Sequence, residues 1–240
     1  MKPTIKLLAF SSSRVGNGGY LESVAPVVNS FLGNKTLNVA FIPFASVNAD
    51  YEVYADMVRK GLSGLPLSIH TVTNIHAKET IERADVIMVG GGNTFKLLHD
   101  LYARSLMEVI NNKVLFGTPY IGWSAGSNIV GETICTSNDM PIIYPSSFNA
   151  FGFLPFQINP HYYNQPIIGF NGETRDQRLA EFLQLNQNKK VVALPEGTAL
   201  ILVNEQLRLT GHANAVLFKW EINATTRSEL PLETNLSYLL

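Results

Sequence analysis

The sequence predicts an α/β protein in which a mostly parallel sheet carries helices on both faces. Three observations favour this fold: apolar runs alternate with segments of helical periodicity, the runs are apolar at consecutive positions, and glycine-rich or polar clusters follow several of them. Strands of a parallel sheet look continuously apolar because helices cover both of their faces. We therefore expect a doubly wound sheet, with antiparallel strands toward the C-terminus.

Five apolar runs in the first half of the chain are predicted strands, and three segments between them are predicted helices. The predicted strands are 5–10, 37–45, 67–72, 85–92 and 119–126. The predicted helices are 20–32, 51–62 and 94–110, where apolar residues recur every three or four positions.

The pattern changes after residue 130. Segment 134–166 is rich in Pro, Asn and Ser and predicts loops with short strands. A helix is predicted at 173–187 and a buried strand at 190–197, and the short alternating runs of 198–222 indicate antiparallel strands at one sheet edge. Because no repeat, low-complexity tract or linker interrupts the chain, we expect one domain over 1–240.

Composition excludes several classes of protein. A net charge of −1 over 240 residues gives no electrostatic footprint for nucleic acid or for an anionic membrane. No apolar run is long enough for a membrane span or a signal-peptide core, and the single cysteine, Cys135, suits a reducing compartment. We expect a cytoplasmic protein with no cofactor and no metal, because both H-E-x-x-H and a cysteine–histidine cluster are missing.

The segment GWSAG at 122–126 matches the G-x-S-x-G nucleophile elbow. It follows an apolar strand and opens a predicted helix, the context in which a tight turn lifts the serine hydroxyl out of the sheet. The alternative is a glycine-rich turn with an incidental serine. The context favours Ser124 as a nucleophile.

The glycines at 90–92 follow another predicted strand and precede a helix, so their backbone N–H groups are free to bind an anion. A phosphate site is disfavoured, because neither nucleotide-binding glycine pattern is present. Because the serine elbow follows the next predicted strand, we expect an oxyanion hole made by the N–H groups of Gly92 and Ala125. We expect the neighbouring Asn93 to contact the substrate.

A serine nucleophile needs a base, and His161 is the histidine that lies at the end of a predicted strand in a polar-aromatic loop. Two carboxylates compete to orient its imidazole. Asp139 would give the chain order of α/β-hydrolases, but it follows Ser124 too closely for the strand–helix pairs that normally intervene. Glu196 would place each group after a separate strand, which favours it modestly over Asp139.

Six ordered segments resemble the motifs of peptidase E, the α-aspartyl dipeptidase family of serine peptidases, and the similarity runs from about residue 5 to about residue 220. The segments are VGGGNTFKLL, YIGWSAGSN, TSNDMPI, QINPHY, GETRDQR and LPEG. The chain departs from the pattern in GSN after the elbow, where Gly-Ala-Asn is commoner, and in the tail beyond residue 220.

The resemblance implies a fold similar to class I glutamine amidotransferases, with serine in place of their cysteine. It implies cleavage of dipeptides that begin with a free aspartate, with Ser124 as nucleophile, His161 as base and Glu196 as acid. Asp139 then lies near the site but outside the triad. The substrate carboxylate needs a cation, and we expect Arg175 to be that partner.

Two other functions stay open at this point. A cyanophycinase-like peptidase shares the serine elbow but cuts β-aspartyl linkages, and a silent binding module would use the glycine loop to hold a small anion. The expected partner is a small peptide, Asp-Xaa, bound by a monomer or a homodimer.

Overall fold

The structure is a computed structural model that describes residues 4–48, 50–165, 169 and 171–240. Its strands are β1 (Leu7–Phe10), β2 (Leu37–Ile42), β3 (Leu67–Thr71), β4 (Val86–Val89), β5 (Tyr120–Trp123), β6 (Gln157–Asn159), β7 (Lys190–Ala193), β8 (Thr198–Val203), β9 (Gln206–Gly211), β10 (Ala215–Glu221) and β11 (Ala224–Leu230). Its α-helices are α1 (Ala25–Leu32), α2 (Tyr51–Gly61), α3 (Ala77–Arg83), α4 (Thr94–Ala103), α5 (Met107–Leu115), α6 (Ala125–Asn128) and α7 (Arg175–Leu185). A 3₁₀ turn, Ser237–Leu239, lies near the C-terminus.

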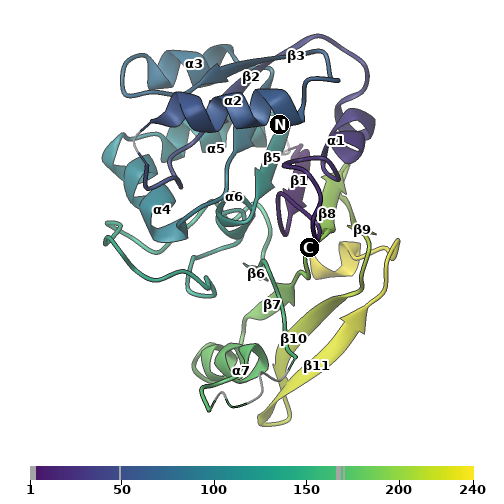
Figure 1. Ribbon diagram of the computed structural model, residues 1–240. Helices are drawn as coiled ribbons and strands as arrows, with labels where there is room; N and C mark the ends of the chain where they lie inside the picture. The colour runs from purple at the N-terminus through teal and green to yellow at the C-terminus, as the bar shows by residue number, and fades with distance from the viewer. Residues whose placement is uncertain (1–3, 49, 166–168, 170) are drawn as a thin grey trace.

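The larger sheet has the strand order β3-β2-β4-β5-β1-β8-β9 (Figure 1). The first five of these strands are parallel, whereas β8 and β9 add to the edge beside β1 in antiparallel pairs. In the β4–β5 pair, Val89 lies opposite Gly122. The glycine loop after β4 and the serine elbow after β5 therefore leave the same edge of the sheet side by side, where ligands of open α/β sheets bind.

Helices cover both faces of this sheet, and its central strands β1, β4 and β5 are buried at every position. In β1, Leu7 and Ala9 pack with the core that includes α3, α4 and α5, whereas Leu8 and Phe10 pack with the core that includes α1 and α2. Successive side chains of a strand point to opposite faces, so this division follows directly from the pleat. The predicted α/β fold with a mostly parallel sheet is confirmed.

A smaller sheet of order β11-β10-β7-β6 lies below the larger one in Figure 1, together with α7. Its strands β6 and β7 are parallel neighbours, and β7 pairs antiparallel with β10. Leu179 and Leu183 of α7 pack on this sheet against Val191 and Phe218. The smaller sheet matters for the site because the loops that follow β6 and β7 reach the residue that follows β5.

Four details of the predicted elements are wrong. The helix predicted over 94–110 is two helices, with Ser105 between them at a φ of 55°. Helix α1 begins at Ala25 instead of residue 20, and α3 was not predicted. The alternating strands of 198–222 do not all lie at one sheet edge, since β10 joins the second sheet. Residue 166 of the predicted loop segment lies outside the described residues.

In the described part of the chain, no helix is long and apolar enough to cross a membrane.

Candidate active site

The serine elbow is a sharp turn between β5 and α6. Ser124 has a φ of 54° and a ψ of −114°, a conformation that side chains rarely adopt. The flanking glycines permit it, because a Cβ on Gly122 would overlap the carbonyl of Gly126 and a Cβ on Gly126 would overlap the carbonyl of Val89. The unfavourable backbone conformation therefore occurs at the residue whose hydroxyl the turn presents above the sheet edge.

Ser124, His161 and Glu196 form one hydrogen-bonded row. The Oγ of Ser124 lies 2.9 Å from Nε2 of His161, and Nδ1 of His161 lies 2.9 Å from Oε1 of Glu196. His161 follows β6 and Glu196 follows β7, so the parallel pairing of these two strands brings their loops together. The side chains of His161 and Glu196 are 41% and 56% exposed, so this end of the row is open to solvent.

Two serines at the end of β1 hold the loops that carry this row, and sequence reasoning did not single them out. The buried Ser11 accepts from the N–H of His161 at 2.9 Å and donates to the carbonyl of Leu194 at 2.7 Å. Ser12 accepts from the N–H of Gly197 at 3.2 Å. These hydrogen bonds join the loops after β6 and β7 to the end of β1, the strand next to β5. Neither serine belongs to a sequence pattern that would have indicated this role.

The predicted oxyanion donors flank the serine. Neither the N–H of Gly92 nor that of Ala125 has an acceptor among the described residues. The glycine loop touches the elbow, since a Cβ on Gly91 would lie 2.9 Å from the Cβ of Ser124. Gly92 has a φ of 139° and packs on Ala45, where a side chain has no room.

Asp139 and Asn93 are both engaged at the N-terminus of α4. Asp139 accepts from the N–H of Thr94 at 2.7 Å, a favourable place for a carboxylate because the first helical N–H groups lack partners. Asn93 caps the helix by accepting from Lys96 at 3.0 Å, and its Nδ2 donates to the carbonyl of Met140 at 2.9 Å. Within the described residues, Asp139 has no hydrogen bond to His161.

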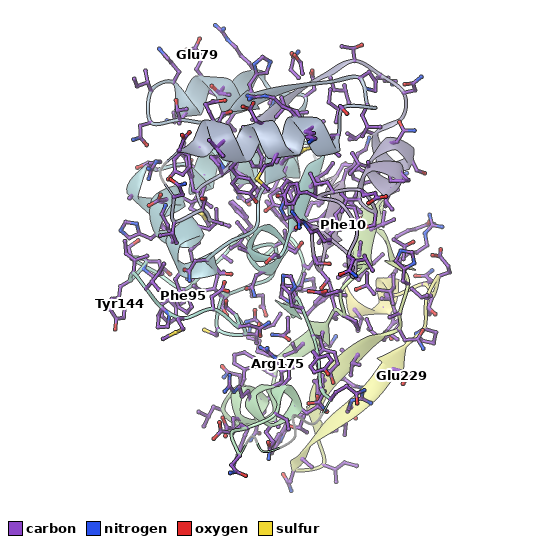
Figure 2. The ribbon with its side chains drawn as sticks, in the orientation of Figure 1. Phe10, Glu79, Phe95, Tyr144, Arg175 and Glu229 are labelled. Atoms are coloured by element: carbon purple, nitrogen blue, oxygen red, sulfur yellow. The ribbon has the colours of Figure 1, made fainter. Side chains whose placement is uncertain are left out.

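Arg175 is the first residue of α7 and lies on the side of that helix toward the larger sheet (Figure 2). Its guanidinium is half-buried and has no hydrogen bond or ion pair among the described residues. Burial lowers its pKa, the charge of Arg178 lowers it further, and the charge of Asp139 opposes both. Asp139 and Arg175, which the sequence placed near one site, are therefore within electrostatic reach of each other.

A cavity of about 550 Å³ opens beside Ser124 and His161. Gly92 and Asn93 line it on one side and Tyr54 and Trp123 on another, whereas Arg175 does not line it. Its volume lies within the range of cavities that bind small molecules. No group of three His, Cys, Asp or Glu side chains in the described ranges could hold a metal ion.

Comparison with known proteins shows which family the chain resembles. The model of peptidase family S51 matches residues 7–210. A protein named peptidase E from Nostoc sp. is 46% identical over 98% of this chain and 96% of its own length. A peptidase E from Haemophilus influenzae strain PittGG is 44% identical over 97% of this chain and 99% of its own length.

Two solved structures share the fold. The structure of a peptidase from an acI-B1 Actinobacterium has a TM-score of 0.73 at 18% identity, covering 98% of this chain and 97% of its own. A protein assigned to peptidase E from Listeria monocytogenes has a TM-score of 0.66 at 22% identity, covering 88% of this chain and all of its own. The chain therefore belongs to peptidase family S51 and is a hydrolase of the peptidase class.

Proposed function

We propose that the protein is a serine dipeptidase that hydrolyses Asp-Xaa dipeptides with a free N-terminal aspartate through an acyl-enzyme on Ser124. The observation that carries the proposal is the row Ser124–His161–Glu196, with 2.9 Å between each pair of partners, at the mouth of a cavity. The resemblance to α-aspartyl dipeptidases supports the substrate class. The single cysteine, Cys135, supports a cytoplasmic location.

The row has a fixed direction for proton transfer. A carboxylate only accepts hydrogen bonds, so Nδ1 of neutral His161 carries the proton and donates to Glu196. Nε2 is then the acceptor for the Ser124 hydroxyl and takes its proton as Oγ attacks the aspartyl carbonyl. Glu196 stabilises the imidazolium that forms.

The negative charge that develops on the carbonyl oxygen needs donors that are already in place. The N–H groups of Gly92 and Ala125 supply them in this proposal, since both lack an acceptor among the described residues and flank Ser124. His161 then protonates the leaving amine. Water attacks the aspartyl ester with His161 again as base, which releases aspartate and restores the Ser124 hydroxyl.

Arg175 is the proposed partner of the substrate's side-chain carboxylate. A buried carboxylate without a paired charge is heavily penalised, and an arginine can grip it with two parallel hydrogen bonds. The half-buried Arg175 guanidinium, with no partner among the described residues, is a cation available for that pairing. Its nearest competitor in sequence, Arg178, is 55% exposed and lies 4.0 Å from Glu173.

Substrate assays test the proposal. The purified enzyme should hydrolyse Asp-Leu and leave β-Asp-Leu and Leu-Leu intact. Preference for β-Asp-Leu would assign it to the β-aspartyl branch. No turnover, together with no labelling by a serine-directed phosphonate, would indicate the anion-binding module.

Replacing one arginine tests the specificity. Arg175→Ala should lower kcat/KM for Asp-Leu by about 10²–10³, because it leaves the substrate carboxylate unpaired. The matched control Arg178→Ala should stay near wild type, and both variants should react normally with a small neutral acylating reagent. Unchanged turnover of Asp-Leu in Arg175→Ala would show that another residue reads the aspartate.

A further inference from the structure

Tyr54 lies beneath the glycine loop and is not part of the proposed triad or oxyanion hole. It comes from α2, and its O–H donates to the carbonyl of Gly91 at 3.0 Å. The ring packs edge-on against Phe41 with centroids 5.1 Å apart. A Cβ on Gly90 would overlap the Tyr54 hydroxyl, so the loop and the ring fit each other closely.

The hydrogen bond of Tyr54 acts on one particular peptide group. The carbonyl of Gly91 and the N–H of Gly92 belong to the same planar unit and point in opposite directions. A donor that holds the carbonyl therefore also fixes the direction of the N–H, which has no acceptor among the described residues. Glycine has the greatest backbone freedom of any residue, so a loop of three glycines needs such an anchor.

The polar side chains around Tyr54 donate to its hydroxyl oxygen, so the hydroxyl proton is available for the bond to the Gly91 carbonyl. Nε1 of Trp123 donates to the hydroxyl oxygens of Tyr20 and Tyr54 at 3.1 and 3.2 Å, and Tyr20 donates to Tyr54 at 3.2 Å. Hydrogen bonds in such a chain polarise one another, which strengthens the last donor. Burial raises the pKa of Tyr54, so the hydroxyl keeps its proton at neutral pH.

We infer that Tyr54 is a positioning residue of the oxyanion hole: its hydroxyl orients and polarises the Gly91–Gly92 peptide so that the Gly92 N–H meets the oxyanion. Trp123, which precedes Ser124 in the chain, ties the same cluster to the elbow. The inference rests on the proposed function, because it requires an oxyanion at Ser124.

The test compares Tyr54→Phe with Tyr20→Phe, a matched variant that removes a hydroxyl from the same cluster but not the one on Gly91. Tyr54→Phe should lower kcat for Asp-Leu about ten- to a hundredfold, below the 10²–10³ typical of deleting a donor, because the amide remains but is no longer fixed. KM should change less than about threefold. Affinity for an aspartyl aldehyde, which forms a tetrahedral adduct with Ser124, should fall by the same factor as kcat.

Two further readouts separate positioning from a general structural role. The pH profile of kcat should keep its shape, since the Tyr54 hydroxyl does not titrate near neutral pH. 3-Fluorotyrosine at position 54 keeps the ring and the donor to the Gly91 carbonyl, and it should retain at least a third of the wild-type kcat.

Wild-type kcat in Tyr54→Phe, a rise of KM alone, or an equal loss in Tyr20→Phe would overturn the inference. These outcomes are distinguishable from failure of the proposed function, in which Ser124→Ala would keep its activity. A Tyr54→Phe enzyme with full activity and an inactive Ser124→Ala would refute the positioning role alone.

Discussion

Ser124 occupies a backbone conformation that costs on the order of 1–3 kcal/mol for a non-glycine residue. Contacts around Ser124 offset this cost. The N–H of Ser124 donates to the carbonyl of Phe10 at 3.1 Å, and the flanking glycines pack against neighbouring backbone. The conformation aims the hydroxyl at His161 instead of into the sheet. The strain is consistent with the proposed catalytic role of Ser124, whereas a simple turn at this point would be better served by glycine.

The proposed role of Glu196 as the carboxylate that assists His161 can be tested by single substitutions. Glu196→Gln should lower kcat for Asp-Leu about 10²-fold, less than the ~10⁴ found for a buried triad acid, because the Glu196 side chain is 56% exposed and water replaces part of its effect. Asp139→Asn should cost less than tenfold, since an asparagine oxygen can still accept from the N–H of Thr94. Steady-state kinetics on the two purified variants compare them; a larger loss in Asp139→Asn would reverse the assignment.

Sequence reasoning reached some of these residues and not others, for a physical reason. Ser124 and the glycines around it carry a local pattern, because the tight turn requires those residue types at fixed spacing. The choice between Glu196 and Asp139 depends on which strands pair, and the β6–β7 pairing joins segments more than thirty residues apart. Ser11 and Tyr54 act through long-range hydrogen bonds and leave no trace in the neighbouring sequence.

Helix α4 carries a largely buried ion-pair network centred on Asp100. Asp100 accepts from Lys96 at 2.8 Å and lies 3.3 Å from Arg104, one turn away on either side, and 3.0 Å from Nδ1 of His99. Burial raises the pKa of Asp100, but the hydrogen bonds from Lys96 and His99 and the charges of Lys96 and Arg104 outweigh it, so the net pKa is lowered. The network therefore stabilises the fold above the ordinary pKa of an aspartate and loses that contribution as the pH falls below about 4.

Replacing Asp100 by asparagine should show this dependence. Asp100→Asn should lower the free energy of unfolding at pH 7 by about 2–3 kcal/mol, somewhat less than removal of one partner from a fully buried pair. The difference from wild type should be smaller at pH 3, because the Asp100 carboxylate of the unfolded chain is then largely protonated and the stability that comes from its lowered pKa in the folded protein is being lost. Urea denaturation at both pH values measures it, with Asp56→Asn, whose side chain is 74% exposed, as a control expected to change stability by less than about 1 kcal/mol. An equal deficit at pH 7 and pH 3 would refute the ionic origin.

The break between α4 and α5 and the unpredicted helix α3 share one cause, which is packing against the rest of the fold. Nothing in the sequence of 104–106 marks a break, since neither glycine nor proline is present, yet Ser105 adopts a φ of 55° and the N–H of Leu106 donates to the carbonyl of Leu101. Packing of α4 and α5 on the same sheet face decides the break. Helix α3 is short and depends on the burial of Ala77 and Ile81, so its tertiary contacts matter more than its own periodicity.

The candidate active site lies where the strand ends of the two sheets come together. The larger sheet contributes the serine and the glycine loop from the adjacent ends of β5 and β4, and the smaller sheet contributes His161 and Glu196 from the ends of β6 and β7. The sequence predicted the parallel sheet because its central strands β1, β4 and β5 are continuous apolar runs that alternate with segments of helical periodicity. The second sheet was not predicted as a separate unit, because alternating strands look alike whether they extend one sheet or form another.

The central claim is that Ser124 is the nucleophile and that His161 activates it. An aspartyl phosphonate ester, which forms a stable adduct with an activated serine, tests the claim directly when the labelled protein is digested and the modified peptide is identified by mass spectrometry. We expect one adduct, on Ser124, with labelling lost in Ser124→Ala and slowed at least a hundredfold in His161→Ala. An adduct on another residue, or undiminished labelling in His161→Ala, would contradict it.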